Sequence, residues 1–304
     1  MVELSLGINA GFASNRFPEH SEWLRIVREE LGLTYVQFVT DLLDPLFTPE
    51  KIKEKAYGEI DAAVKKYNLR ILFTFASTYS RRNQLMHPDK EMRALAFKWF
   101  KAEIDQATRL GTEATGSNFG IMSVLDSHNP ERREFITNEA IGYYRALLSY
   151  AHRKGLKYLF FEPMSIPRER PCTIRDTLFL MKACSRGAAI PMKLLLDVGH
   201  GYSKSPCRED RNPYIWLERL AAFSPAIHIR QTDASLSPVW PFTREYNRRG
   251  IIRPEKVIRS IEKSGAKKVC LLLEISHRER SPMEERVIKD LKESVRYWRR
   301  FVKD

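Results

Sequence analysis

The sequence predicts a (β/α)8 barrel of the α/β class, and three observations point to it. Short apolar runs typical of buried strands alternate with longer helical segments along the chain. Eight such strand–helix pairs fit into 304 residues, as this barrel requires. Several strands also end on an ionisable residue, where barrel proteins place their chemistry. No linker or composition shift marks a second domain, so we expect residues 1–304 to form one barrel with its site at the C-terminal ends of the strands.

The first four strand–helix pairs are marked by apolar runs and clear helix stops. Gly32 is expected to stop the first helix. The second helix is expected to have Thr48 as its N-cap and Pro49 at its first position, and to end at Asn68. A long third helix ends near Gly111. The strands expected here are Leu4–Asn9, Thr34–Val39, Arg70–Ala76 and Glu113–Asn118.

The last four pairs carry the more informative strand ends. Asn129-Pro130 precedes a helix that ends at Gly155 behind basic residues. Thr173 caps the helix after a proline-rich loop, and the long loop Gln231–Arg253 leads into a helix at Pro254. Two further helices are expected over Pro213–Phe223 and Pro282–Val302. The strands are the runs Leu156–Phe161, Lys193–Leu196, Pro225–Ile229 and Lys267–Leu273.

A doubly wound open sheet is the alternative fold. It would need a switch point and usually a glycine-rich first turn, and the segment Gly7–Gly11 matches such a turn poorly. The barrel is therefore the preferred prediction.

The composition describes an ordinary globular protein with a basic balance. Hydrophobic residues make up 43% and charged residues 29% of the chain, and 51 Lys and Arg against 38 Asp and Glu give a net charge of +13. This excess suits an anionic ligand, either a phosphorylated metabolite or a nucleic acid. It also suits a surface rich in ion pairs. Because the basic residues are spread along the chain, charge alone does not separate these readings.

The chain also indicates a cytoplasmic protein that does not enter a membrane. Its four cysteines are scattered, without CxxC spacing, and we expect them to be reduced thiols. Met1 leads almost directly into the first strand, with no signal-peptide pattern. No apolar run approaches the length of about 20 residues that spans a bilayer.

Four successive strands end on metal-ligand residue types. The four residues are Glu162, Asp197, His228 and Glu274. Any one of them could simply be a polar residue at a strand end, but four in succession form a hard-metal ligand set. Because a closed barrel brings its strand ends around one mouth, they predict one divalent ion, with Mn²⁺ expected first and Mg²⁺, Co²⁺ or Zn²⁺ as alternatives.

Such an ion would suit proton transfer next to a carbonyl group. Held by a carbonyl and a neighbouring hydroxyl, it acidifies the adjacent C–H bond by stabilising an enediolate. Glu162 and Glu274, on the first and last of these four strands, are the candidates for a pair that removes and returns the proton.

The chain resembles the sugar-phosphate isomerase/epimerase superfamily, the xylose isomerase-like TIM barrels that include D-tagatose and D-psicose 3-epimerases. The resemblance covers the whole chain. It is carried by the segments Phe160–Pro163, Leu194–Gly201, Ala226–Asp233 and Leu271–His277, in the family's order. It implies that Glu162, Asp197, His228 and Glu274 bind the metal, that the two glutamates are the acid/base pair, and that His200 binds substrate.

Further segments resemble one branch, the tetrulose 4-phosphate racemases (3-epimerases) of erythritol breakdown. They are Gly7–Glu19, Val36–Pro45, Thr115–Gly120, Glu162–Glu169 and Gly250–Val257. Epimerases of free ketohexoses carry a second substrate-gripping Glu six residues after the first metal ligand, whereas this position is Pro167 here. The departure favours an anionic sugar phosphate as the substrate.

Other substrate contacts are expected from residues near the mouth. Arg168, Arg230 and Arg253 are phosphate candidates, because a guanidinium group matches phosphate oxygens bidentately. Asn118 ends the fourth strand and could contact substrate or only cap a turn.

Three rival functions remain open. An aldose–ketose isomerase or a free-ketose 3-epimerase would use the same metal and enediolate. A metal-dependent DNA-repair endonuclease would suit the charge, but needs a cluster of metals and more histidines than this mouth offers, so no nucleic acid partner is expected. The sequence leaves open whether the chain forms a homo-oligomer.

Overall fold

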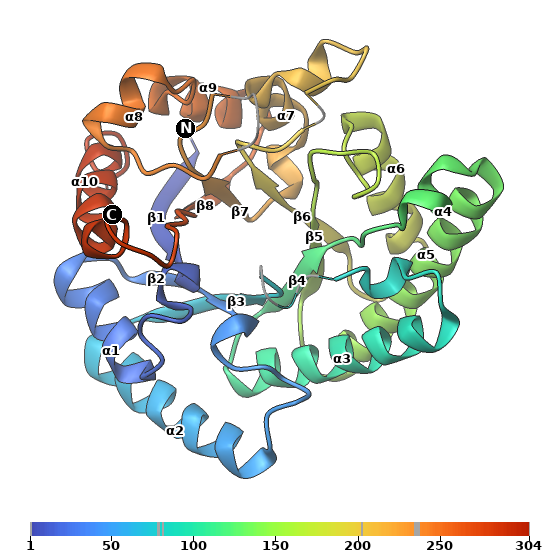
Figure 1. The fold of residues 1–304 in the computed structure, drawn as a ribbon, viewed down its shortest axis with the longest axis horizontal. Coiled ribbons are helices and arrows are strands. Elements are labelled where there is room, and N and C mark those ends of the chain that lie inside the picture. The colour runs from blue at the N-terminus through green and yellow to red at the C-terminus, as the bar shows by residue number, and fades with distance from the viewer. Residues whose placement is uncertain (1, 78–79, 81, 202, 234–237, 304) are drawn as a thin grey trace.

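Eight parallel strands form a closed barrel in the computed structural model, which describes residues 2–77, 80, 82–201, 203–233 and 238–303. Each strand pairs with its neighbour in sequence, and β1 pairs with β8 to close the ring (Figure 1). The strands are β1 Glu3–Asn9, β2 Tyr35–Val39, β3 Arg70–Phe75, β4 Ala114–Asn118, β5 Tyr158–Glu162, β6 Met192–Asp197, β7 Ala226–Ile229 and β8 Lys268–Leu273. The predicted (β/α)8 barrel is confirmed.

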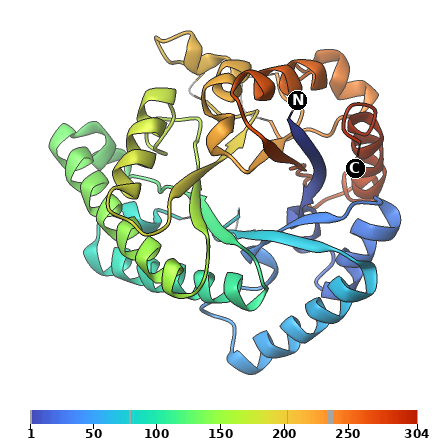
Figure 2. The same cartoon turned by 180° about the vertical axis from the view of Figure 1, so that it is seen from behind.

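Helices surround the barrel of strands, as the views from the front (Figure 1) and from behind (Figure 2) both show. The helices are α1 His20–Arg25, α2 Glu50–Tyr67, α3 Lys90–Arg109, α4 Val124–His128, α5 Pro130–Arg153, α6 Ile174–Ser185, α7 Pro213–Leu220, α8 Arg244–Arg249, α9 Pro254–Lys263 and α10 Val287–Trp298. The helix expected before Gly32 continues from α1 as a π-helical turn, Ile26–Glu30. The short helices α4 and α8 lie in segments that were expected to be loops, and residues 234–237 of the second loop lie outside the described part of the chain.

The helix ends show which sequence signals determined them. Asn68 ends α2 in the left-handed conformation, with φ of 50°. The side chains of Asn129 and Thr173 accept hydrogen bonds at the starts of α5 and α6, as expected of N-caps. The expected N-cap at Thr48 is wrong: Pro49 has an extended ψ of 143°, so it takes the N-cap position itself and α2 begins one residue later.

Two apolar layers hold the site in place. The larger layer lies between the strands and the surrounding helices and includes the fully buried Trp23 and Trp298. The smaller layer fills the barrel interior, where the Phe73 and Phe160 rings meet with centroids 4.9 Å apart. The Phe75 ring lies edge-on to the imidazole of His228, 5.5 Å between centroids. The ionisable side chains of the mouth therefore contact a closely packed apolar layer in the barrel interior, which limits their movement.

Among the described residues, no helix combines the length and the continuous apolar character that crossing a bilayer demands.

Candidate active site

The four predicted ligand residues meet at the mouth of the barrel. One ligand atom from each of Glu162, Asp197, His228 and Glu274 lies within 4.8 Å of the others. The register explains the meeting: Asp197 at the end of β6 is paired with His228 in β7, and Glu274 directly follows β8. Glu162, Asp197 and His228 are buried, and Glu274 is half-buried. We call this group the carboxylate–histidine cluster.

The cluster concentrates negative charge in a buried place. Three carboxylates share it with one imidazole, and the adjacent guanidinium of Arg230 ion-pairs with Asp197. Oδ2 of Asp197 is buried and has no hydrogen-bond partner among the described residues. Oxygen ligands with one imidazole and no thiolate are suited to a hard divalent cation. The residues present therefore fit such an ion.

The proton affinities reflect this crowding. Burial would lower the pKa of His228, but the carboxylates of Glu274 and Glu162 raise it to about 9. Burial raises the pKa of Glu274 to about 8, although His228 opposes the shift. Burial acts in the same direction on Asp197, but the nearby Arg230, His200 and His228 hold its pKa below the usual range. The crowded negative charge and the burial therefore make His228 and Glu274 hold protons more tightly than usual, and a cation bound at the centre of the group would compete with those protons.

Gln37 sets the orientation of the cluster histidine. Nε2 of His228 lies 2.6 Å from Oε1 of Gln37, and an amide oxygen can only accept, so Nε2 donates this hydrogen bond. The other ring nitrogen, Nδ1, therefore faces Glu162 at 3.0 Å and Glu274 at 3.4 Å. This is the way in which a neighbouring group fixes the tautomer of a metal-binding histidine.

Asp197 is fixed by two donors that depend on one glycine. Its Oδ1 accepts from the backbone N–H of Gly199 at 2.5 Å and from Nε of Arg230 at 2.9 Å. A Cβ on Gly199 would lie 2.5 Å from that same Nε atom. Gly199 is thus needed for the close approach of the guanidinium group to the turn.

The cluster opens into a cavity of 340 Å³. Asn118, His200 and Arg230 line it, and Nδ1 of His200 lies 3.6 Å from Oε1 of Glu162. Asn118 is 2% exposed, and neither polar atom of its amide has a hydrogen-bond partner within the described chain. A buried amide in this state costs stability unless a ligand or water satisfies it.

Two of the phosphate candidates lie elsewhere. Arg168 is not among the described residues that line this cavity, and its Nη1 donates to the carbonyl of Met122 at 3.0 Å. Arg253 is the N-cap residue of α9, where its Nη1 donates to the carbonyl of Ile252, and it is not among the described residues that line the cavity either.

Sequence reasoning missed several residues of this site. Besides Gln37, these include Asn9, whose Nδ2 donates to Oε1 of Glu274 at 3.2 Å, and Arg16, which lines the cavity. Gln37 is an amide inside an otherwise apolar strand, and Asn9 is the last residue of β1. These two positions were the sequence signals from which Gln37 and Asn9 could have been predicted as residues of the site.

Comparison with known proteins places the chain in a family. Residues 27–301 match the sequence profile described as "Xylose isomerase-like TIM barrel". The D-erythrulose 1-phosphate 3-epimerase of Brucella abortus (strain 2308) is 32% identical over 298 residues, which are 98% of this chain and 96% of that protein.

Solved structures agree with this assignment. A Rhodospirillum rubrum protein, named only provisionally as a xylose isomerase, superposes with a TM-score of 0.87 and 30% identity over 98% of this chain and 99% of that one. D-Psicose 3-epimerase from Clostridium cellulolyticum, at 11% identity with a TM-score of 0.70 over 98% and 99% of the two chains, shows the shared fold. The curated relative is an epimerase, and epimerases are isomerases, so the prediction of an isomerase is confirmed. The chain belongs to the xylose isomerase-like TIM barrel family.

Proposed function

We propose that this protein is a metal-dependent 3-epimerase of a short phosphorylated ketose, a tetrulose phosphate. The observation that carries the proposal is the carboxylate–histidine cluster, in which Glu162 and Glu274 come from strands on either side of Asp197 and His228. The Brucella relative, named for D-erythrulose 1-phosphate, supports this substrate class and favours the 1-phosphate over the 4-phosphate.

The divalent ion would be held by Glu162, Asp197, His228 and Glu274, and Mn²⁺ is the first choice. When bound, it would polarise the substrate carbonyl and lower the pKa of the neighbouring C–H bond. Gln37 keeps Nδ1 of His228 directed at the cluster, and Gly199 with Arg230 keeps Asp197 in place.

The two glutamates move the proton. One carboxylate removes the C3 proton of the ketose and leaves an enediolate, and the other returns a proton to the opposite face, which inverts C3. In Figure 1, β5 and β8 lie at opposite ends of the arc of four strands that carries the cluster. In this proposal Glu162 and Glu274 accordingly act on opposite faces of the substrate.

The polar residues of the cavity position the substrate. Among the described residues, the side-chain amide of Asn118 has neither an acceptor for its N–H groups nor a donor for its oxygen, which suits a sugar hydroxyl. His200 reaches the cluster edge, and Arg230 offers the guanidinium group for the phosphate. Arg168 has no part in this proposal because its side chain is held by the loop after β4.

The test follows the C3 proton. Purified enzyme with Mn²⁺ is given D-erythrulose 1-phosphate in D₂O, and the product is followed by NMR and chiral analysis. We expect inverted product that carries deuterium at C3. Glu162→Gln and Glu274→Gln should each slow inversion by roughly 10²–10⁴-fold, the range for a positioned acid or base. Inverted product without deuterium would point to hydride transfer and contradict the proposal.

Substrate panels separate the rival activities. Erythrulose 4-phosphate keeps the free C1 hydroxyl that an aldose–ketose isomerase needs, whereas the 1-phosphate does not. Aldose formed from the 4-phosphate would therefore favour the isomerase. Faster turnover of free D-psicose or D-fructose than of either tetrulose phosphate would favour a free-ketose epimerase.

A further inference from the structure

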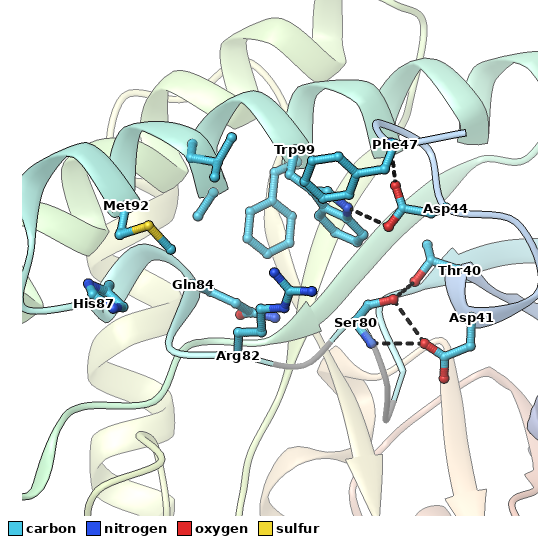
Figure 3. Close-up of a pocket in the computed structure, with 13 residues that line it drawn as sticks. Thr40, Asp41, Asp44, Phe47, Ser80, Arg82, Gln84, His87, Met92 and Trp99 are labelled. Carbon is cyan, nitrogen blue, oxygen red and sulfur yellow. Dashed lines mark hydrogen bonds between the residues drawn. The ribbon is translucent and has the colours of Figure 1, made fainter. Parts of the chain in front are cut away.

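A second cavity lies beside the catalytic one, between the loop after β2 and the first turns of α3 (Figure 3). Its volume is 220 Å³. The two cavities share Asp41, whose Oδ1 accepts from the backbone N–H and the hydroxyl of Ser80, both at 2.9 Å. None of the cluster residues lines the second cavity, so it is a separate site.

One side of this cavity is aromatic and unusually exposed. Trp99 and Phe100 on α3 meet edge to face, with centroids 5.4 Å apart. Phe47, Met92 and Leu95 complete the side and are 60%, 41% and 39% exposed. Large apolar side chains gathered around a hollow and left in water are typical of a binding site.

The opposite side carries polar groups without partners. Gln84 is 7% exposed, and neither its amide nitrogen nor its amide oxygen has a hydrogen-bond partner in the part of the chain that the structure describes. Its φ of 54° is uncommon for a residue with a side chain. Burying a polar side chain without a hydrogen-bond partner costs free energy, and so does an unfavourable backbone conformation. Such costs are typical of positions where a bound ligand uses the polar group.

The charges of the cavity indicate what the ligand must bring. Oδ1 of Asp44 already accepts from the N–H groups of Leu46 and Phe47, and its Oδ2 accepts from Nε1 of Trp99 at 3.1 Å. The carboxylate of Asp41 is engaged by Ser80. Within the described residues Arg82, by contrast, makes no hydrogen bond or ion pair, and Figure 3 shows its side chain reaching toward the aromatic side. The available groups are therefore mainly donors, with one positive charge.

We propose that this cavity binds a single-ring aromatic carboxylate. The ring packs on Trp99 and Phe47, the carboxylate accepts from the guanidinium group of Arg82, and Gln84 bonds a second polar atom on the ring or beside it. The size agrees, because a cavity of about 150 Å³ accepts benzene and the further space takes one carboxylate group.

The test uses benzoate and 4-hydroxybenzoate as probes on the full-length enzyme. Binding is followed by saturation-transfer NMR and by titration. We expect dissociation constants of about 0.1–1 mM, usual for ligands of this size. The second hydrogen-bonding group should make 4-hydroxybenzoate the tighter ligand. Arg82→Met should weaken both probes about tenfold, since it removes the charge and keeps the length. Gln84→Leu should remove the advantage of 4-hydroxybenzoate over benzoate.

Matched controls show where the probes bind. Arg259→Met, an equivalent change on the exposed face of α9, should leave binding unchanged. Ala96→Phe should abolish binding by filling the cavity, with circular dichroism checking the fold. Benzylamine should bind more weakly than benzoate.

Four results would overturn the proposal. The first is that neither probe binds at concentrations about 10-fold above the expected range. The second is equal binding by the wild type and Arg82→Met. The third is loss of binding when Mn²⁺ is added, which would place the probes in the cavity beside the carboxylate–histidine cluster. A change in sedimentation of the Phe47→Ala variant without any probe would also contradict it, because the aromatic side would then be a contact between copies of the chain.

Discussion

The two halves of the barrel mouth differ in the polar side chains that their strands present. Strands β5 to β8 present ionisable groups, which form the carboxylate–histidine cluster. Strands β1, β2 and β4 present the amides of Asn9, Gln37 and Asn118. Two of these amides bond to cluster members, and the third faces the cavity into which the cluster opens. One half is thus suited to hold a cation and move protons, while the other orients what the first half holds.

The sharpest test of this division removes a ligand from the charged half. Asp197→Asn and His228→Ala should each lose bound metal and reduce turnover by roughly 10⁴-fold or more, because both the Lewis acid and the substrate anchor are lost. The barrel should stay folded, as neither change opens the apolar layers. Metal content by mass spectrometry and circular dichroism check both parts. Full metal occupancy in both variants would show that the cluster does not bind the ion.

A smaller effect is expected from the amide half. Gln37→Leu removes the acceptor that fixes Nε2 of His228, so metal affinity and turnover should fall roughly 10–100-fold. Gln106→Leu is the matched control, since Gln106 is also buried but donates to the carbonyl of Leu43 in the loop after β2. Titration with Mn²⁺ measures the affinity. If both variants lost metal affinity equally, the cause would be general destabilisation and not the orientation of the imidazole.

Asn118 should separate substrate binding from stability. Asn118→Leu should raise KM about tenfold, because the lost binding free energy corresponds to roughly one hydrogen bond. The affinity for Mn²⁺ should stay unchanged. Because the amide has no partner in the described chain, the free energy of unfolding should stay the same or rise. Denaturant titration and steady-state kinetics measure the two quantities. A loss of stability with unchanged KM would assign Asn118 to the fold instead of the substrate.

The substitution expected to affect turnover least replaces a buried carboxylate that lies outside the barrel mouth. Burial raises the pKa of Glu103 on α3 to about 8, from an ordinary value of 4.5. Between those values the unfolded chain releases this proton while the folded chain keeps it. Stability therefore falls as pH rises, by up to about 1.4 kcal/mol per pH unit, and the loss is complete above the folded pKa.

Glu103→Gln should remove this dependence. The variant should gain stability over wild type by a few kcal/mol between pH 5 and pH 8, while turnover stays unchanged. Urea unfolding at the two pH values measures the difference. A constant difference would mean that Glu103 ionises normally in the folded protein.

The charged half was predictable from sequence because its signals are local. Each strand of a closed parallel barrel is buried on both faces, so it reads as an apolar run, and an ionisable residue at its end is conspicuous. The order of the strands then determines which ends meet. This is why Glu162, Asp197, His228 and Glu274 could be grouped without coordinates.

The amide half was not predictable because its signals are not local. Gln37 and His228 are 191 positions apart, and Asn9 and Glu274 are 265 apart, so their meeting depends on the register around the whole barrel. The positions of loop side chains are still harder to predict from the sequence. Arg168 has the right chemistry and a suitable position in sequence, but the carbonyl of Met122 holds its guanidinium group elsewhere. The start of α2 was also predicted one residue too early, because Pro49 takes the N-cap position.

The pairing of β1 with β8 has a consequence for how the protein is made. Among the strands of this barrel, β1 is synthesised first, and it finds its second neighbour only when β8 has been synthesised. Until then β1 has an open edge and Asn9 has no Glu274 to contact. A nascent chain therefore cannot acquire the activity gradually, since the site is assembled in one late step. Its exposed edge makes this interval the period in which the chain most needs protection from aggregation.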